Sequence, residues 1–203
     1  MLTEINPYNP QRKRILEIVK LLERGGIVAY PTDTIYGIGC DIFSKKGLDK
    51  IQQLKGRDKN KPLSFICSDL SHISQFAKVP NYAYRIMKRL LPGPYTFILD
   101  ASSEVPRMLM PKRKTVGIRV PDNAIVLSIV KELGHPLITT SANFSGEDVI
   151  SDPFDIERLM GKQLDAVIDG GKLSGEPSTV IDLTGKAPEI LRKGAGDYSW
   201  IEE

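Results

Sequence analysis

Histidine and cysteine are scarce in this sequence, whose 203 residues include two of each. Cys40, Cys67, His72 and His135 are scattered and show no spacing that suits metal ligands, so no resident metal site is expected. Both cysteines lie beside apolar residues, which favours reduced thiols in a cytoplasmic protein over a disulfide.

Long apolar runs are also missing. No stretch approaches the roughly 20 apolar residues that cross a bilayer. The opening residues, MLTEINPYNPQRKR, lack the apolar core of a secretory signal. We therefore expect a cytoplasmic protein without a membrane partner. The formal net charge of +3 is small, and it neither requires nor excludes nucleic acid.

Several common motifs of nucleotide and hydrolase sites are absent. The sequence has no G-x-x-x-x-G-K-[ST] loop, and Gly37-Ile38-Gly39 lacks the third glycine of a dinucleotide fingerprint. It also has no G-x-S-x-G elbow and no H-E-x-x-H. If the protein binds ATP, it does so without a P-loop or a Rossmann turn.

The apolar pattern predicts a mixture of helices and strands. The length favours one domain over residues 1–203, because no Pro-, Gly- or Ser-rich linker divides it. Helical periodicity predicts helices over 10–22 (capped by Asn9), 47–54, 81–91, 125–133 and 153–160. Apolar runs predict strands over 27–30, 63–67, 95–99, 115–120, 137–140, 166–168, 179–183 and 189–191. This order indicates an α/β fold with an open, mixed sheet.

Two polar stretches directly follow apolar strands, where open sheets tend to bind ligands. Tyr30–Gly39 contains two threonines, Asp33 and closely spaced glycines, and Thr139–Gly146 contains small hydroxyls and Asn143. Such groups can bind phosphate or sugar oxygens. They serve as often in a tight polar turn or a cap, and for the first stretch we weigh the two interpretations evenly.

Two basic segments are candidates for binding anions. Lys55 and Arg57 flank Gly56, so a turn there could direct both cations at one phosphate. A solvated basic loop is the commoner outcome for such a run. Arg119 lies inside an apolar strand and therefore needs a partner, either an acid or a ligand carboxylate.

Taken together, seven stretches resemble the YrdC-like family, which includes the L-threonylcarbamoyladenylate synthases. The family pattern runs P-T-[DE]-T-x-Y-G-L, K-x-R with N/K-P-L, P-G-P-x-T, R-x-P, S-A-N-x-S-G, S-T-V-[VI]-D and L-R-x-G. In this sequence these stretches occur in the same order at Pro31–Ile38, Lys55–Leu63, Pro92–Thr96, Arg119–Pro121, Ser141–Gly146, Ser178–Asp182 and Leu191–Gly194.

The resemblance implies a twisted α/β sheet with helices around a basic cavity. It also implies a reaction in which L-threonine, bicarbonate and ATP give threonylcarbamoyl-AMP and pyrophosphate, with Mg²⁺ on the ATP phosphates. The product would pass to the tRNA threonylcarbamoyl transferase machinery, which modifies the adenosine beside the anticodon. The absence of a C-terminal extension resembles the short form of the synthase.

The family's site residues map onto this sequence one by one. Thr34, Arg119 and Ser178 fall where the family binds threonine. The positions where it binds ATP are Lys55, Arg57, Lys61, Thr115, Ser141, Asn143, Ser151 and Arg192. Of these, Lys55, Arg57, Ser141 and Asn143 would be the catalytic residues. No base adjoins Ser141 in the sequence, so we expect it to form hydrogen bonds rather than act as a nucleophile.

Other features resemble the YciO-like branch of the same family, namely the stretches at 6–11, 151–153 and 169–171. At the position of Ile66 the synthases usually have a histidine that helps bind threonine. We expect Ile66→His to tighten threonine binding if this side chain points into the cavity.

The alternative function is a YciO-like protein that binds tRNA, double-stranded RNA or ribosomes without synthase activity. The aromatic and basic residues that would support it are Tyr82, Tyr84, Arg85, Lys88 and Arg89 on one predicted helix, with Lys112–Lys114.

Overall fold

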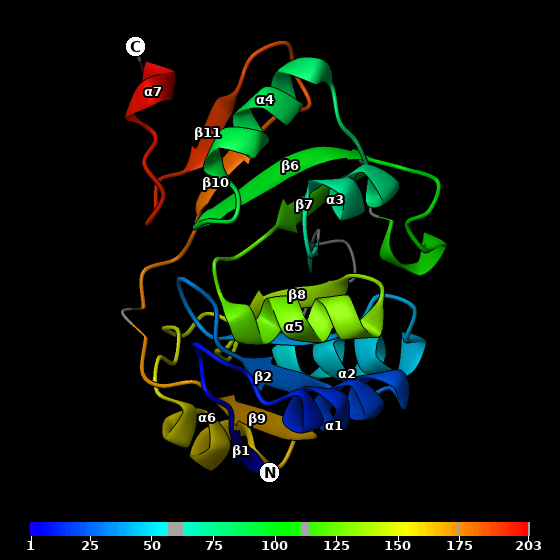
Figure 1. Ribbon diagram of the computed structural model, residues 1–203, viewed down its shortest axis with the longest axis vertical. Coiled ribbons are helices and arrows are strands. Elements are labelled where there is room, and N and C mark those ends of the chain that lie inside the picture. Colours follow the sequence, from blue (N-terminus) through cyan, green and yellow to red (C-terminus); the bar gives the residue numbers. More distant parts are fainter. Residues whose placement is uncertain (57–62, 111–113, 174, 203) are drawn as a thin grey trace.

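One twisted, mixed sheet runs through the computed structural model, which describes residues 1–56, 63–110, 114–173 and 175–202 (Figure 1). Within these residues eleven strands join in the order β1-β9-β2-β3-β8-β4-β7-β6-β10-β11, with β5 paired to β6. Their bounds are β1 Leu2–Glu4, β2 Val28–Tyr30, β3 Gly37–Asp41, β4 Ser64–Ile66, β5 Ala77–Lys78, β6 Tyr95–Ala101, β7 Thr115–Arg119, β8 Leu137–Ser141, β9 Ala166–Asp169, β10 Thr179–Asp182 and β11 Glu189–Arg192. The sheet combines parallel pairs such as β4 with β7 and antiparallel pairs such as β4 with β8, which confirms the predicted α/β fold with a mixed sheet.

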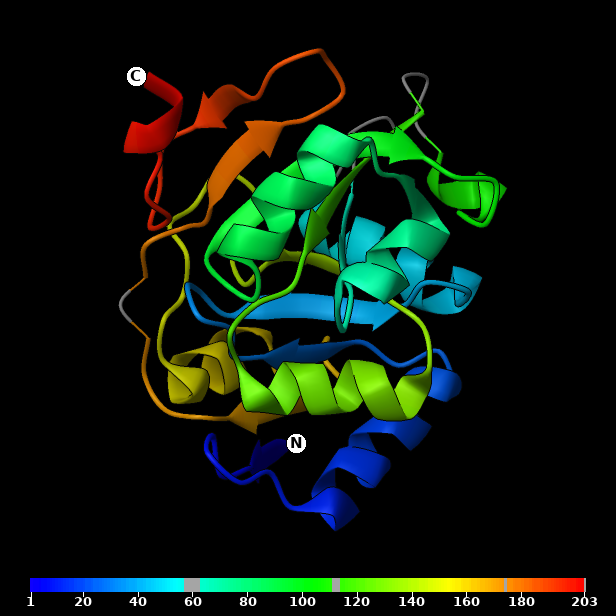
Figure 2. The same ribbon diagram turned by 45° about the horizontal axis from the view of Figure 1, so that its top comes forward.

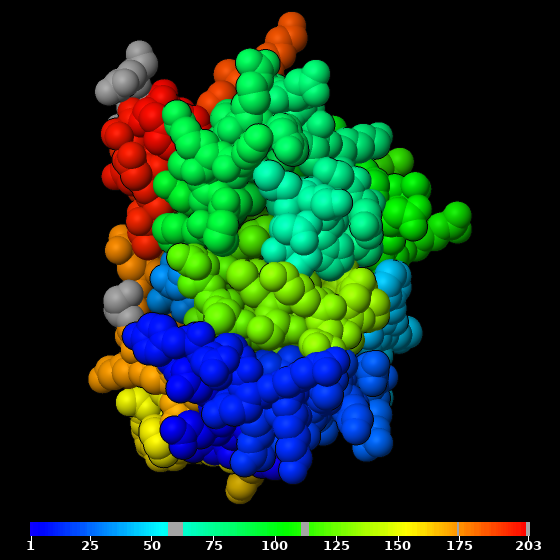
Figure 3. Space-filling model, viewed as in Figure 1, coloured from blue at the N-terminus to red at the C-terminus, as the bar shows by residue number. Residues whose placement is uncertain are grey.

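Helices pack on both faces of this sheet, as the two ribbon views show (Figures 1 and 2). Their bounds are α1 Arg12–Glu23, α2 Lys45–Lys55, α3 Leu70–Phe76, α4 Asn81–Leu90, α5 Ala124–Leu133, α6 Pro153–Met160 and α7 Ser199–Glu202, with a 3₁₀ turn at Arg107–Leu109. Side chains of α1, α3, α4 and α5 cover the side of the molecule seen in Figure 3. Over the described residues, no helix is long and apolar enough to span a bilayer.

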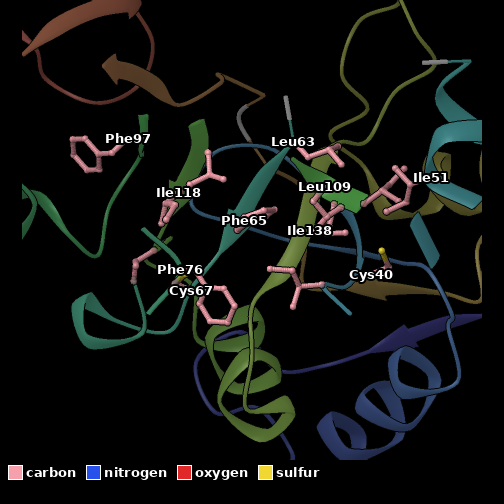
Figure 4. Packing of buried hydrophobic residues seen from close by; sticks show 14 of the residues in the cluster. Cys40, Ile51, Leu63, Phe65, Cys67, Phe76, Phe97, Leu109, Ile118 and Ile138 are labelled. Carbon is pink, nitrogen blue, oxygen red and sulfur yellow. The ribbon is translucent and has the colours of Figure 1, made fainter. Parts of the chain in front are cut away.

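Strand alternation divides the side chains of the central strands between two environments. Phe65 of β4, Ile118 of β7 and Ile138 of β8 point into the larger apolar cluster, where Figure 4 shows them beside one another. Their neighbours along each strand face the other side of the sheet. There, Tyr30, Ile66 and Leu137 pack against α1 and α5. Beyond the helices, the same face carries polar residues, which form the site described below.

The predicted elements all occur, with ends shifted by one to a few residues, but the predicted cap of the first helix is wrong. The helix begins at Arg12 after Gln11, whose side chain makes no capping bond. The N–H of Asn9 instead donates to Asn6 Oδ1, 3.0 Å away, in the preceding loop. The Asn-Pro pair therefore forms part of a turn ahead of the helix.

The predictions omitted α3 and, more important for the site, β3, which pairs with both β2 and β8. Its glycines suggested a loop, but a close contact requires them in a strand. A Cβ at Gly39 would lie 2.8 Å from the Tyr30 hydroxyl oxygen, because the Tyr30 ring lies against this strand. Small residues can therefore mark a strand that a ring covers, as well as a turn.

Candidate functional site

A cavity of about 170 Å³ opens on the polar part of the sheet face. The described residues around it are Ile35, Tyr36, Gly37, Ser64, Thr96, Arg119, Thr139, Thr140, Ser141, Ser178 and Arg192. This set is rich in hydroxyl groups, has two guanidinium groups and includes no carboxylate. Its chemistry therefore suits a small anionic or hydroxyl-bearing ligand.

The cavity exists because the strands beneath it carry small side chains. Gly117 sits opposite Ser64 across the β4–β7 pair. A Cβ at Gly117 would lie 2.6 Å from Ser64 Oγ and 3.3 Å from Thr96 Cγ2. Any larger residue at this position would displace those side chains or fill the space above them.

Arg119 projects from the end of β7 and forms a buried ion pair. Its Nη2 atom donates to Asp33 Oδ1 at 3.0 Å and to Thr34 Oγ1 at 2.9 Å. The side chains of Arg119 and Asp33 are only 9% and 10% exposed. Burial lowers the pKa of Arg119, but an arginine starts from a value so high that the guanidinium stays charged. The expected acidic partner is therefore Asp33.

The loop between β2 and β3 holds Thr34 in place beside Arg119. Thr32 Oγ1 lies 3.0 Å from Thr34 Oγ1 and donates to the Ile35 carbonyl at 2.6 Å. The Tyr36 hydroxyl donates to the Gly171 carbonyl at 2.8 Å, and burial raises the pKa of Tyr36 to about 12. The loop is thus a hydrogen-bonded turn, and it also supplies part of the cavity wall.

Ser178 and Arg192 close the opposite side of the cavity. Ser178 Oγ lies 2.8 Å from Thr96 Oγ1. Arg192 Nη2 donates to the Ser178 carbonyl at 2.7 Å, and Arg192 Nε donates to the same oxygen at 3.1 Å. Two residues that are 14 positions apart in the sequence are therefore fixed to each other at the cavity.

Lys55 is the last residue of α2 and is buried, with 7% of its surface exposed. Its ammonium donates to the Ser141 carbonyl at 3.2 Å, to the Asn143 carbonyl at 2.6 Å and to Asn143 Oδ1. Ser141 Oγ donates to the same Oδ1 at 2.7 Å. Lys55 therefore differs from the solvated cation that is the commoner outcome for such a run, because it ties α2 to the segment after β8. Gly56 then ends the helix with a positive φ of 51°.

The other predicted residues are placed differently. Arg57 and Lys61 lie outside the described residues. Thr115 begins β7 and pairs with Asp100, and it does not line the cavity. Ser151 accepts a backbone bond from Leu173 at 3.0 Å and is likewise absent from the lining. The structure therefore brings together the predicted Arg119, Ser141, Ser178 and Arg192, with Thr34, Lys55 and Asn143 bonded to this group.

Thr139 and Thr140 line the cavity and belong to a stretch that was predicted to bind a ligand, whereas Ser64 and Thr96 were missed as site residues. Each is a polar position within a strand that is otherwise apolar. That alternation was readable in the sequence, since a hydroxyl in a buried strand marks a polar face. What could not be read was which strands are neighbours, because β8, β4 and β7 are brought together from distant segments.

Neither a resident metal nor a reactive thiol is evident in the described part of the chain. No group of three or more His, Cys, Asp and Glu side chains there is placed to hold a metal ion. Cys40 and Cys67 are free and buried, and burial raises the pKa of both thiols. These two residues therefore belong to the core.

Comparison with known proteins identifies the family. Residues 20–194 match the Sua5/YciO/YrdC family model, which is described as telomere recombination. The crystal structure of Escherichia coli YciO superposes with a TM-score of 0.92 at 41% identity, over 97% of each chain. The putative threonylcarbamoyl-AMP synthase of Methanocaldococcus jannaschii is 37% identical over 91% of this chain and 87% of its own length.

A relative with a bound ligand was also found. The structure of Pyrococcus abyssi Sua5 complexed with L-threonine superposes with a TM-score of 0.89 at 30% identity, over 96% of this chain and 57% of that one. These similarities confirm the resemblance drawn from the seven motifs, and the chain belongs to the Sua5/YciO/YrdC family.

Proposed function

We propose that this protein is an L-threonylcarbamoyladenylate synthase, which makes threonylcarbamoyl-AMP and pyrophosphate from L-threonine, bicarbonate and ATP. The observation that carries the proposal is the cavity, which is lined both by residues predicted to bind threonine and by residues predicted to bind ATP. Hydrogen bonds join Arg119 to Thr34 and Arg192 to Ser178. Relatives named threonylcarbamoyl-AMP synthase, at 30–37% identity, support the same reaction.

The size and lining of the cavity suit the amino acid. A volume of about 170 Å³ is below the range of about 300–1,000 Å³ that is usual for drug-sized ligands. In this proposal Arg119 binds the threonine carboxylate through a charge-assisted bond, while Thr34 and Ser178 accept or donate hydrogen bonds at its polar groups. The nucleotide then extends beyond the cavity rim.

The nucleotide would bind where Lys55, Ser141 and Asn143 meet, with Arg192 across the cavity. Lys55 supplies a positive charge and Arg192 a planar set of donors, which together suit phosphate oxygens. Arg57 and Lys61 are assigned to ATP by the family resemblance alone, as are Thr115 and Ser151. The lining offers no carboxylate to coordinate a divalent cation, so Mg²⁺ enters this proposal as part of the nucleotide substrate.

The chemistry requires charge stabilisation more than a covalent nucleophile. The threonine amine adds to bicarbonate, and loss of water leaves a carbamate. A carbamate oxygen then attacks the α-phosphorus of ATP, a P–O bond forms, and the bond to the pyrophosphate leaving group breaks. Negative charge spreads over the phosphate oxygens in that step, where fixed cations and donors lower the barrier.

The proposal is tested by pyrophosphate release from ATP. We expect release only when both bicarbonate and an amino acid are present, with threonine preferred, and threonylcarbamoyl-AMP as the product in mass spectrometry. Release without amino acid would indicate simple ATP hydrolysis. No release with any amino acid at millimolar concentration would refute the synthase function.

A second candidate, RNA binding, is favoured by one observation on α4. Tyr84 is 42% exposed on this helix, and Arg85 and Lys88 lie one and four positions after it. Two other residues of α4 that were predicted to bind RNA make contacts within the protein instead. Tyr82 donates to the Leu183 carbonyl at 2.6 Å, and the Arg89 guanidinium lies 5.0 Å from the centre of the Trp200 ring. RNA affinity that falls steeply with salt, without any synthase activity, would favour this function.

A further inference from the structure

Only one member of the ion pair between Asp33 and Arg119 lines the cavity. Arg119 lines the cavity, whereas Asp33 does not. Asp33 therefore holds the guanidinium from behind, and the carboxylate is kept away from any ligand in the cavity. A carboxylate within the cavity would repel the carboxylate of an amino acid, and this placement avoids that repulsion.

Asp33 is itself fixed at its second oxygen. Oδ2 accepts a bond of 3.0 Å from the backbone N–H of Asp122, just after β7, while Oδ1 accepts from Arg119. The carboxylate thus links the β2–β3 loop to the residue that follows the strand carrying Arg119. With both oxygens engaged, Asp33 can hold one edge of the guanidinium at a defined position.

The rest of the guanidinium makes no hydrogen bond within the described residues. Only Nη2 takes part in the hydrogen bonds found for Arg119 among the described residues. Nε is buried, and it has no hydrogen-bond partner in the part of the chain that the structure describes. A buried donor without a partner is costly, so a ligand oxygen that reached it would be bound favourably.

Asp33 also offsets a repulsion across the cavity. Arg192 lines the same cavity, and its positive charge acts on Arg119. Two guanidinium groups facing one small cavity would move apart if neither had a counter-charge. Arg192 is held by Ser178 oxygens, and Arg119 is held by Asp33.

We propose that Asp33 is a positioning residue, whose carboxylate orients Arg119 so that the free donors of the guanidinium meet the carboxylate of the amino-acid substrate. This inference rests on the proposed synthase function and assigns to Asp33 the control of amino-acid affinity. Asp33 touches neither substrate, so its effect passes through Arg119 and should be confined to one of the two substrates.

The test compares Asp33→Asn with a matched control, Asp122→Asn. Asp122 is an exposed neighbour of the same pair, and it donates to Asp33 through its backbone N–H, which this substitution leaves in place. Losing a charge-assisted bond should raise the threonine KM of Asp33→Asn about tenfold. The ATP KM should stay within about twofold, as should both constants of the control. Asp33→Glu keeps the charge but shifts it by one methylene, and its threonine KM should lie between those of the wild type and Asp33→Asn.

Three outcomes would overturn the inference: an unchanged threonine KM in Asp33→Asn, an equal rise in both constants, or the same effect in the control. If Asp33→Asn does not fold, Asp33→Glu decides the question alone, since unaltered kinetics in that variant would contradict a positioning role.

A crystal structure of the variant separates this inference from the proposed function. If the wild type has no synthase activity, the proposed function fails, but the position of Arg119 can still be measured. We expect its guanidinium to leave the site beside residue 33 in Asp33→Asn or Asp33→Glu. A guanidinium that stays in place would refute the positioning role whether or not the protein is a synthase.

Discussion

The ammonium of Lys55 lies 2.6 Å from the backbone carbonyl oxygen of Asn143, 88 residues later in the sequence. The same ammonium also donates to the Ser141 carbonyl and to Asn143 Oδ1. A residue assigned to ATP phosphates is therefore also a structural link between α2 and the segment after β8. Because Lys55 has both roles, its replacement should affect stability as well as activity.

Lys55→Ala should lower stability as well as abolish adenylate formation. The substitution leaves three partly buried oxygens without their cationic donor, which should reduce the free energy of unfolding by about 1–3 kcal/mol. Urea unfolding followed by circular dichroism measures this loss. Lys45→Ala on the same helix is the control, because its ion pair with Asp49 is exposed and should contribute less than about 1 kcal/mol. Equal stability of Lys55→Ala and the wild type would contradict the structural role.

Arg119→Lys should raise the threonine KM far more than the ATP KM. A lysine keeps the charge but cannot hold Asp33 and Thr34 with one group while presenting other donors to a ligand. We expect about a tenfold rise for threonine, corresponding to one charge-assisted bond. Steady-state kinetics with each substrate varied in turn measures both constants. Parallel rises would place Arg119 at a part of the site shared by the two substrates.

Gly117→Ala should impair the site by filling its floor. The added Cβ would meet Ser64 Oγ at 2.6 Å, so Ser64 must move into the cavity or the strands must separate. Overpacking of this kind costs about 1–3 kcal/mol, and we expect synthase activity to fall with it. Gly185→Ala is the control, because its Cβ would approach only the Ala187 carbonyl, at 3.6 Å. Wild-type activity in Gly117→Ala would show that the neighbouring side chains can move without filling the cavity.

Ile66→His should not tighten threonine binding, contrary to the expectation from the family. Ile66 is fully buried with Tyr30 and Leu137 and is absent from the cavity lining, so its side chain does not meet the stated condition. An imidazole there would lack a partner and should cost about 1–3 kcal/mol of stability. Calorimetry with threonine, together with thermal unfolding, tests both statements. Ile66→Val is the control, with an expected cost of about 0.5–1.5 kcal/mol. Tighter threonine binding by Ile66→His would mean that the new side chain turns toward the cavity.

His72 should make stability depend on pH. Burial lowers its pKa, the charge of His135 acts in the same direction, and Asp69 opposes both. The unfolded chain therefore takes up a proton near pH 6.5, while the folded protein takes it up only at lower pH. The stability contributed by neutral His72 is full above about pH 6.5 and is lost as the pH falls through the folded pKa.

The test of this pH dependence is His72→Asn. The Ser68 N–H donates to His72 Nδ1 at 3.2 Å, and an asparagine oxygen can accept the same bond without titrating. Thermal unfolding from pH 7.5 down to about pH 5 should show a shallower decline for the variant than for the wild type. Identical slopes would show that other groups cause the dependence.

The order of helices and strands was predictable because periodicity is a local property. Ile15, Ile18, Val19 and Leu22 marked α1, and all four are buried. The pairing of strands was not predictable, and so neither was the partner of Arg119. An acid was required by burial, but nothing in the sequence singled out Asp33 across 86 positions. The contacts of Lys55 were unpredictable for the same reason, since its carbonyl partners belong to a distant segment.

The segments that complete the cavity come from widely separated parts of the chain, and two of its residues come late. Ser178 precedes β10, and Arg192 ends β11, beyond β6 in the sheet. During synthesis, the earlier strands can pair while β6 is still an edge of the sheet and the cavity is open on that side. A nascent chain therefore acquires its second guanidinium only when the last strands have left the ribosome and paired. Substrate binding then stabilises only chains that have finished folding.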